Sequence, residues 1–114
     1  MSTLWDDIHH LRRRDERRSH APEPARELLL AKVSEEANEA LELYRRMRGW
    51  GTNGTVTATC EEVCDEVCAA IMAAMVALDC LAPDARVHWQ RYLAHGADRA
   101  RAENQAASPH NSST

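Results

Sequence analysis

The chain has few of the residues that fill a large hydrophobic core. Its 114 residues include no Phe, two Tyr and three Trp, with ten Leu, six Val and two Ile against nineteen Ala. This length fits one domain of modest size. Because small side chains let helices pack closely but bury little apolar area, we expect a thin core. Assembly into a homo-oligomer, a dimer or a tetramer, would supply the missing burial.

The chain also lacks the signals of a membrane protein or a polyanion binder. No apolar run reaches the roughly 20 residues of a membrane-spanning helix, and no signal-peptide pattern is present. We therefore expect a cytoplasmic protein with no membrane partner. The net charge of −4 and the isoelectric point near 5.8 leave no excess of basic side chains. Because general nucleic-acid binding depends on basic side chains that contact phosphates, no specific nucleic-acid partner is expected.

Glycine and proline are scarce, with four of each, and they divide the chain into helix-length segments. Apolar residues recur three and four positions apart within these segments, which predicts amphipathic helices. The predicted helices cover residues 2–18, 25–48, 59–81 and 84–103. Short connections favour antiparallel neighbours, so the predicted fold is all-α, a four-helix bundle-like array in a single domain over residues 1–104. Residues 105–114 are polar, and they predict a disordered tail.

Local signals mark the ends of the two central helices. Thr59 followed by Glu62 predicts a capping box at the start of the third helix. Gly49 is placed as the residue that ends the second helix. The segment Gly49–Gly54 also spells the Gly-x-Gly-x-x-Gly of dinucleotide-binding folds. That interpretation is rejected, because the segment follows a helix and no parallel strand is predicted. Within this loop Trp50 either stacks on a base or packs, and packing is the commoner role.

The third predicted helix is unusual in its apolar and cysteine content. From Val67 to Leu78 every residue is apolar, and a helix that is apolar on all sides must be buried on all sides. This run predicts a subunit interface or a tight bundle centre. Cys60, Cys64 and Cys68 follow a four-residue spacing, which is neither the Cys-x-x-Cys of zinc sites nor suited to a disulfide within one helix. We expect the cysteines, with Cys80, to be packing residues.

The first predicted helix is rich in arginine. Its basic residues surround two acidic ones, Asp15 and Glu16, and they are Arg12, Arg13, Arg14, Arg17 and Arg18. An arginine cluster can bind phosphates, but interleaved acids at helical spacing favour a solvated, salt-bridged face.

Two acidic motifs carry the functional prediction. Successive helical residues turn by about 100°, so Lys32, Glu36 and Glu39 fall within a strip about 60° wide, with Glu35 beside it. The strip borders an apolar stripe, which comprises Val33, Ala37, Leu41 and Tyr44. The third helix repeats the spacing with Glu62 and Asp65, and this pair borders a stripe of Val63, Val67, Ala70 and Ala74.

Packing of the two helices through those stripes would bring four carboxylates to one point. Such a cluster repels itself unless a cation binds, and oxygen ligands without thiol or imidazole suit Mg²⁺ or Mn²⁺. A simpler interpretation is a solvated acidic face, since Glu is a good helix former and acidic first turns favour the helix dipole. Two motifs, each beside an apolar stripe, favour the metal site.

These residues resemble the signature of a known family. The pattern is Lys32-x-x-Glu35-Glu36-x-x-Glu39 followed by Glu62-x-x-Asp65. It resembles the Glu-Glu-x-x-Glu and Glu-x-x-Asp motifs of the all-α MazG-type nucleoside triphosphate pyrophosphohydrolases. The resemblance covers Leu28 to Leu81. One departure is Glu66, at a position where such proteins usually continue with an apolar residue.

The resemblance implies Mg²⁺-dependent hydrolysis of a nucleoside triphosphate to the monophosphate and pyrophosphate, in nucleotide-pool control or house-cleaning. It assigns the metal to Glu36, Glu39, Glu62 and Asp65, with Mn²⁺ as a possible substitute. Glu35 is the candidate to orient or deprotonate the attacking water. Lys32 would contact a phosphate or offset the charge of the cluster. The preferred base and sugar are not implied.

Two other functions compete with this enzyme. The first is a non-catalytic helical oligomeric interaction module whose acidic face is only solvated. The second is a di-iron carboxylate bundle, which uses Glu-x-x-His motifs on facing helices. No Glu in this chain has a His three residues later, so the di-iron hypothesis is excluded. The interaction module remains the alternative to the pyrophosphohydrolase.

Overall fold

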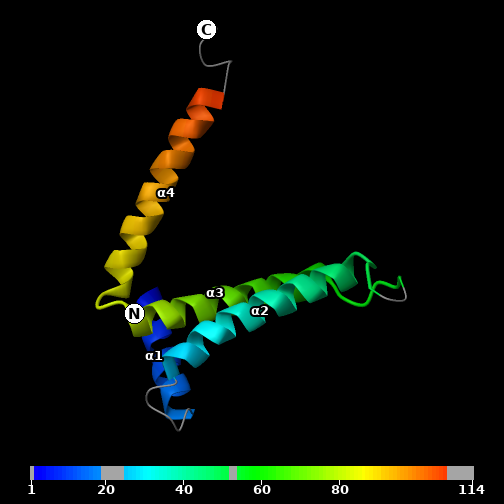
Figure 1. Ribbon diagram of the computed structural model, residues 1–114, viewed down its shortest axis with the longest axis horizontal. Helices are drawn as coiled ribbons and strands as arrows, with labels where there is room; N and C mark the ends of the chain where they lie inside the picture. The colour runs from blue at the N-terminus through cyan, green and yellow to red at the C-terminus, as the bar shows by residue number, and fades with distance from the viewer. Residues whose placement is uncertain (1, 19–24, 52–53, 108–114) are drawn as a thin grey trace. The chain divides into compact units, whose positions relative to one another are not determined.

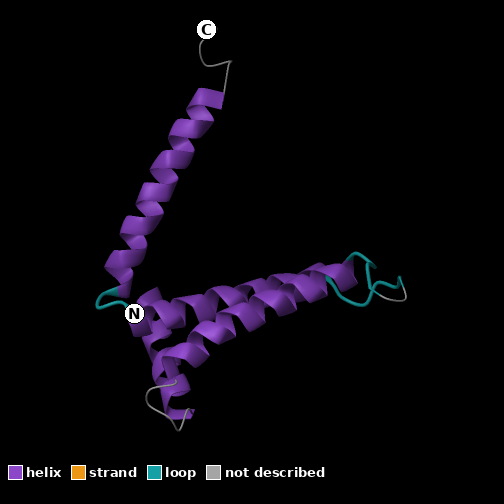
Figure 2. Cartoon of the chain, in the orientation of Figure 1, coloured by secondary structure: helices purple, strands orange, loops and turns teal. Residues whose placement is uncertain are grey.

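A computed structural model describes residues 2–18, 25–51 and 54–107, and this part of the chain is all-α. It contains α1 (Leu4–Arg18), α2 (Ala25–Met47), α3 (Cys60–Leu81) and α4 (Ala85–Ala107). Figure 2 shows helices and loops, and no strand among the described residues. The chain divides into two compact units, Met1–Leu81 with the first three helices and Ala82–Thr114 with α4. The array of all four helices in one domain stays a prediction.

The predicted helix boundaries are confirmed within two residues, with one exception at the end of α4. That helix continues past Glu103 to Ala107, so residues 105–107 are helical and the prediction of a tail beginning at Gln105 is wrong for them. Gln and Ala are good helix formers, which accounts for the extra turn. The predicted loop at Ser19–Pro24 and the rest of the predicted tail, 108–114, lie outside the described residues.

Capping boxes begin α1 and α3. The Thr3 backbone N–H donates to Asp6 Oδ2 at 3.0 Å, and the Asp6 N–H donates to Thr3 Oγ1 at 3.2 Å. These bonds hold the pKa of Asp6 below its usual value. At α3 the Thr59 N–H donates to Glu62 Oε1 at 3.0 Å, and the Glu62 N–H donates to Thr59 Oγ1 at 3.1 Å. Each box satisfies two backbone donors that the helix leaves free, and the prediction at Thr59 is confirmed.

A Schellman motif ends α2 at the predicted glycine. Gly49 has φ of 71°, its N–H donates to Arg46 O at 3.3 Å, and the Trp50 N–H donates to Arg45 O at 2.8 Å. The Arg46 side chain then extends along the loop, where Nε donates to Thr57 Oγ1 and Nη2 to Thr57 O, both at 3.0 Å. The loop between α2 and α3 is thereby attached to the end of α2.

The first unit is an α2–α3 hairpin crossed by α1. Figure 1 shows α2 and α3 side by side, with α1 across the end of the hairpin where α2 begins and α3 ends. The core lies at that crossing, where Ile8 of α1 and Leu29 of α2 pack with Val76 and Ala77 of α3. All four side chains are small or medium-sized aliphatics. The predicted thin core is confirmed in this unit.

Polar contacts supplement this small core at the α1–α3 crossing. Arg12 Nη1 donates to the Asp79 carbonyl oxygen at 2.6 Å and lies 3.3 Å from Asp79 Oδ2. His9 Nδ1 lies 3.1 Å from the same carboxylate oxygen. Asp79 is mostly buried, with 15% of its side chain exposed, so these contacts fix where α1 crosses α3. Arg12 therefore belongs to a structural ion pair, unlike its neighbour Arg13, which is exposed.

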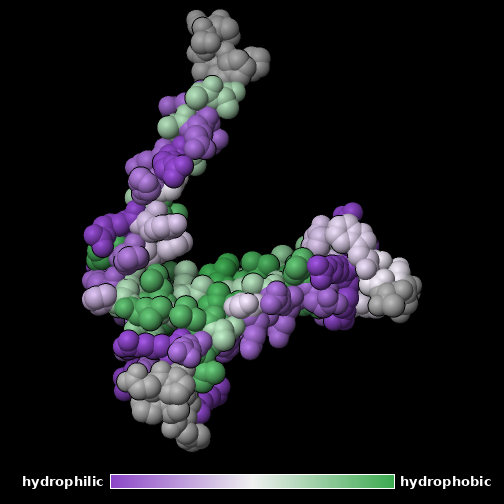
Figure 3. All heavy atoms as spheres, viewed as in Figure 1, coloured by the Kyte–Doolittle hydropathy of each residue, from purple (hydrophilic) through white to green (hydrophobic). Residues whose placement is uncertain are grey.

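The apolar run of α3 is only partly covered by the other helices of the first unit. Ala73, Val76 and Ala77 are buried, whereas Val67 and Ile71 are 45% and 49% exposed. The prediction of burial on every side is therefore not met within the first unit. On the face shown in Figure 3, hydrophobic residues form a green band along α3. No single helix of the described chain is both long enough and apolar enough to span a membrane.

The cysteines divide into two groups. Cys60, Cys64 and Cys68 are exposed free thiols, so the prediction that they are packing residues is wrong within one chain, because the inner face of α3 is formed by other positions. Cys80 is partly buried and packs against the core, as expected. Hydrogen bonding with Cys60 raises the pKa of the Cys64 thiol, which keeps it protonated and disfavours a thiolate metal ligand.

The second unit is the single helix α4. Asp84 caps it, since the Val87 N–H donates to Asp84 Oδ1 at 3.2 Å. Its apolar side chains Tyr92 and Leu93 are 72% and 52% exposed. Within this unit, both apolar side chains are uncovered.

Candidate metal centre

The face that α2 turns toward α3 differs from the predicted apolar stripe. Glu36, Ala40 and Leu43 are partly buried, whereas Ala37 and Leu41 of the predicted stripe are exposed. The helix is rotated by roughly one residue position relative to the prediction. As a result Glu36 lies on the packing face itself and not at its border.

The helix α3 is rotated in the same way. Val63, Glu66 and Ala73 are partly or fully buried, whereas Val67 and Ala74 of the predicted stripe are exposed. The small residues Ala69, Ala70 and Ala73, which follow Glu66 on this face, allow the two helices to approach closely. The acidic residue that α3 turns toward α2 is therefore Glu66.

Three carboxylates converge between the two helices. Glu36 and Glu39 come from successive turns of α2, and Glu66 comes from α3. One oxygen of each lies within 4.8 Å of one oxygen of both others. Glu36 and Glu66 are partly buried, and Glu39 is exposed. The group thus has an inner side between the helices and an outer side at Glu39 that faces solvent.

The electrostatics of this group favour a bound positive charge. Glu66 Oε2 is buried and has no hydrogen-bond partner within the described part of the chain. Partial burial raises the pKa of Glu66, and the neighbouring Glu36 and Glu39 raise it further. Burial of an unpartnered carboxylate oxygen is unfavourable unless a proton or a cation compensates for it. The group therefore takes up a proton or holds a cation.

The ligand set fits a hard divalent cation. All three side chains offer carboxylate oxygens, and the group contains no thiol or imidazole. Mg²⁺ and Mn²⁺ prefer such oxygen ligands, and Mg²⁺ usually keeps several positions for water or phosphate oxygens. The exposed side at Glu39 leaves room for those further ligands. The buried orphan oxygen of Glu66 is the feature of the site that such an ion would satisfy.

The other predicted site residues lie around this group. Glu62 is exposed, and its carboxylate accepts from the backbone and hydroxyl of Thr59 in the capping box. Asp65 is exposed and stands outside the group of three. Glu35 is exposed on α2, next in sequence to Glu36. Metal binding by Glu62 and Asp65 and catalysis by Glu35 stay predictions.

Sequence reasoning did not select Glu66 as a ligand. The available signal was its position four residues after Glu62, which places both on one side of α3. The rotation of α3 decides that Glu66 faces α2, and the run from Val67 to Leu78, which is apolar on every side, does not determine that rotation.

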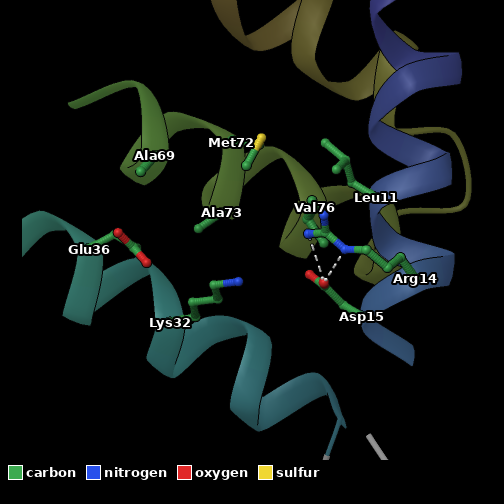
Figure 4. A pocket seen from close by; sticks show the side chains of 9 residues that line it. All are labelled: Leu11, Arg14, Asp15, Lys32, Glu36, Ala69, Met72, Ala73 and Val76. Carbon is green, nitrogen blue, oxygen red and sulfur yellow. Dashed lines mark hydrogen bonds and ion pairs between the residues drawn. The ribbon is translucent and has the colours of Figure 1, made fainter. Parts of the chain in front are cut away.

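A small pocket lies beside the carboxylates, between α1, α2 and α3. Its volume is about 60 Å³, and it shares Glu36 with the group of three. Figure 4 shows the side chains that line it, which are Leu11, Arg14, Asp15, Lys32, Glu36, Ala69, Met72, Ala73 and Val76. Lys32, the other predicted catalytic residue, extends from α2 into this space. The structure thus places Lys32 and Glu36 at one pocket, as their spacing predicts.

Trp50 is not a packed loop residue. It is 61% exposed, although its ring makes an edge contact with Tyr44 at 5.7 Å between centroids. The Arg48 guanidinium lies over the ring at 5.2 Å. These contacts hold the indole at the end of α2 with much of its surface free.

Comparison of the chain with protein-family models, with curated proteins and with solved structures finds no match.

Proposed function

We propose that this chain is a Mg²⁺-dependent nucleoside triphosphate pyrophosphohydrolase of the MazG type, which forms a nucleoside monophosphate and pyrophosphate. One observation carries the proposal: Glu36, Glu39 and Glu66 converge from two helices around a buried, unpartnered carboxylate oxygen. A solvated acidic face would place its carboxylates apart and in water. The resemblance of the Glu35–Glu39 and Glu62–Asp65 motifs supplies the reaction class.

In this proposal Glu36, Glu39 and Glu66 hold the metal ion, and Glu62 and Asp65 are the further ligands that the resemblance assigns. Bound Mg²⁺ supplies positive charge to phosphate oxygens and lowers the energy of the charge that develops during displacement.

The remaining residues of the chain position the reactants. Glu35, exposed beside Glu36, orients or deprotonates the attacking water. Attack by this water breaks the link between the α- and β-phosphates. The Lys32 ammonium donates hydrogen bonds to a phosphate oxygen. Lys32 also offsets part of the negative charge of the cluster, and packing of its stem is the non-catalytic alternative.

The alternative is a non-catalytic helical oligomeric interaction module. The exposed apolar side chains of α3, among them Val67 and Ile71, favour a protein partner for this face. Assembly and catalysis are compatible, so this observation does not compete with the metal site. The module becomes the better account only if the carboxylates bind no metal.

A pyrophosphate-release assay tests the proposal. Purified full-length chain is incubated with a panel of standard and modified nucleoside triphosphates, with Mg²⁺, with Mn²⁺ and with a chelator. We expect release of pyrophosphate, not phosphate, that requires the metal and differs among bases in kcat/KM. Absence of release from every triphosphate, together with absence of Mg²⁺ binding, supports the interaction module instead.

A further inference from the structure

The pocket beside the carboxylates brings two cationic side chains from different helices to one space. Lys32 extends into it from α2 and Arg14 borders it from α1 (Figure 4). Glu36 belongs both to this pocket and to the carboxylate group. Any group bound here therefore lies next to the candidate metal ligands.

Both cations retain hydrogen-bonding capacity. Lys32 forms no ion pair with any described carboxylate. Its three N–H donors are therefore free for a ligand. Arg14 contacts Asp15 through Nη2 at 3.1 Å and Nε at 3.3 Å, and both donors use the same oxygen, Oδ1. A guanidinium has five N–H donors, so this pair leaves Nη1 unused.

The size of the pocket limits what it accepts. Its volume of about 60 Å³ is enough for a few water molecules, since one water needs roughly 10–15 Å³ of such space. Pockets that enclose drug-sized ligands span about 300–1,000 Å³. The space suits one phosphoryl group and excludes a nucleobase or a nucleoside.

The charge of the lining sets a condition on binding. Lys32 and Arg14 are balanced by Asp15 and Glu36, and the rest of the wall is apolar, formed mainly by Ala69, Met72, Ala73 and Val76 of α3. An anion alone meets no net attraction in such a pocket. A divalent cation held by Glu36, Glu39 and Glu66 cancels two of their three negative charges, and the less negative surroundings then favour a phosphate.

We propose that this pocket is the subsite for the terminal phosphoryl group of the substrate and, after hydrolysis, for one end of pyrophosphate. Lys32 and Arg14 are its hydrogen-bond donors. The inference rests on the proposed function, and it extends that function by giving the arginine-rich helix α1 a substrate contact. Because the pocket is too small for a base, Arg14 selects for the length of the phosphate chain and not for the base.

Isothermal titration with Mg²⁺-pyrophosphate tests the subsite directly. The variants are Arg14→Met, which removes the charge but keeps an apolar stem, and the matched control Arg13→Met, at an exposed position next to it. Loss of a charge-assisted hydrogen bond predicts at least about tenfold weaker binding for Arg14→Met. The control changes the net charge equally, so we expect it to stay within about threefold of wild type. Without Mg²⁺, wild type should not bind pyrophosphate.

The outcomes separate this inference from the proposed function. Equal pyrophosphate affinity of Arg14→Met and Arg13→Met overturns the subsite, whether or not triphosphates are hydrolysed. Weaker binding in Arg14→Met alone supports it; if no triphosphate is hydrolysed, the proposed function fails and the pocket stands only as a pyrophosphate-binding site. The ratio of kcat/KM for triphosphate over diphosphate should fall in Arg14→Met and not in the control. Circular-dichroism melts verify that both variants fold, and Arg14→Lys should restore part of the affinity.

Discussion

Glu36 and Glu66 meet between α2 and α3, each partly buried on the face that its helix turns toward the other, with one oxygen of each within 4.8 Å of the other. Two like charges at the centre of a helix interface oppose the packing of that interface. The interface is most stable when a proton or a cation lies between them. If this chain is the proposed metal-dependent enzyme, its folding, metal binding and activity are linked at this one contact.

The first prediction removes one member of this pair. Glu36→Gln keeps the shape of the side chain but loses a charged ligand, so pyrophosphohydrolase activity should fall by orders of magnitude. The metal-free variant should fold as well as wild type or better, because one repulsive charge is gone. Melts with and without Mg²⁺ should show that the ion stabilises wild type more than it stabilises Glu36→Gln.

Glu42→Gln is the matched control, since Glu42 is an exposed residue of the same helix outside the group. It should retain wild-type activity and the wild-type response to Mg²⁺. Undiminished hydrolysis by Glu36→Gln, with neither melt shifted by Mg²⁺, means that the carboxylates are a solvated face.

The second prediction distinguishes the two acidic positions of α3. Glu66→Gln should weaken the binding of Mn²⁺, measured by the paramagnetic resonance of the free ion, because Glu66 provides the buried oxygen. Glu62→Gln should lose less Mn²⁺ affinity than Glu66→Gln. It should also preserve the capping box, which accepts Gln in place of Glu. Thr59→Ala removes the cap itself and should cost about 1 kcal/mol of stability. Loss of Mn²⁺ binding in Glu62→Gln with no loss in Glu66→Gln contradicts the ligand set proposed from the structure.

The third prediction concerns pH. The pKa of Glu66 is raised from its ordinary value of 4.5, by partial burial first and by Glu36 and Glu39 next. A carboxyl group with a raised folded pKa binds more protons when folded, so its contribution to stability is complete below the unfolded pKa and is lost as pH rises through the folded pKa. In a chelator, wild type should match Glu66→Gln near pH 4 and become the less stable of the two as pH rises. Thermal melts across this range measure the difference, and Mg²⁺ should restore wild type alone. A difference that does not change with pH would falsify this assignment.

Where the helices begin and end along the chain follows from local sequence. The rotation of each helix about its own axis does not. Thr59 and Glu62 begin α3 and Gly49 ends α2, because capping and positive φ depend on a few adjacent residues. The orientation of α3 depends on which face packs, and a run that is apolar on every side leaves that open. The sequence therefore predicted an acidic site between two helices but not that Glu66 faces it. The contribution of α1 to the pocket depends on tertiary packing and has no local signal.

The fourth prediction compares two glycines. Gly49 has a positive φ of 71°, and a Cβ there would lie 3.1 Å from the Gly54 carbonyl oxygen, so Gly49→Ala should destabilise the chain by about 1 kcal/mol or more. Gly96 lies within α4, and a Cβ there meets nothing within 4 Å. Gly96→Ala should therefore stabilise by about 0.5–1 kcal/mol through helix propensity. Denaturant unfolding measures both changes, and equal signs would contradict this interpretation of the α2 terminus.

The fifth prediction is that the chain assembles through the apolar face of α3. Ile71 is 49% exposed and Val67 is 45% exposed, and full burial of a side chain such as Ile contributes roughly 1.5–3 kcal/mol. A charge at Ala73 would not test assembly, because Ala73 is 6% exposed within its own chain and the variant would unfold the monomer. Ile71→Glu instead places the charge on the outer surface, where a single chain tolerates it and a packed partner does not.

Light scattering at micromolar concentration should show a dimer or tetramer for wild type and a smaller species for Ile71→Glu. The control is Gln90→Glu, which adds the same charge at an exposed polar position of α4 and should leave the mass unchanged. Ile71→Glu should also have a lower melting temperature than wild type, and that temperature should depend less on protein concentration. The reason is that a homo-oligomer gains stability by mass action. If wild type scatters as a stable monomer, the thin core at Ile8, Leu29, Val76 and Ala77 suffices on its own, and the exposed face of α3 requires a different explanation.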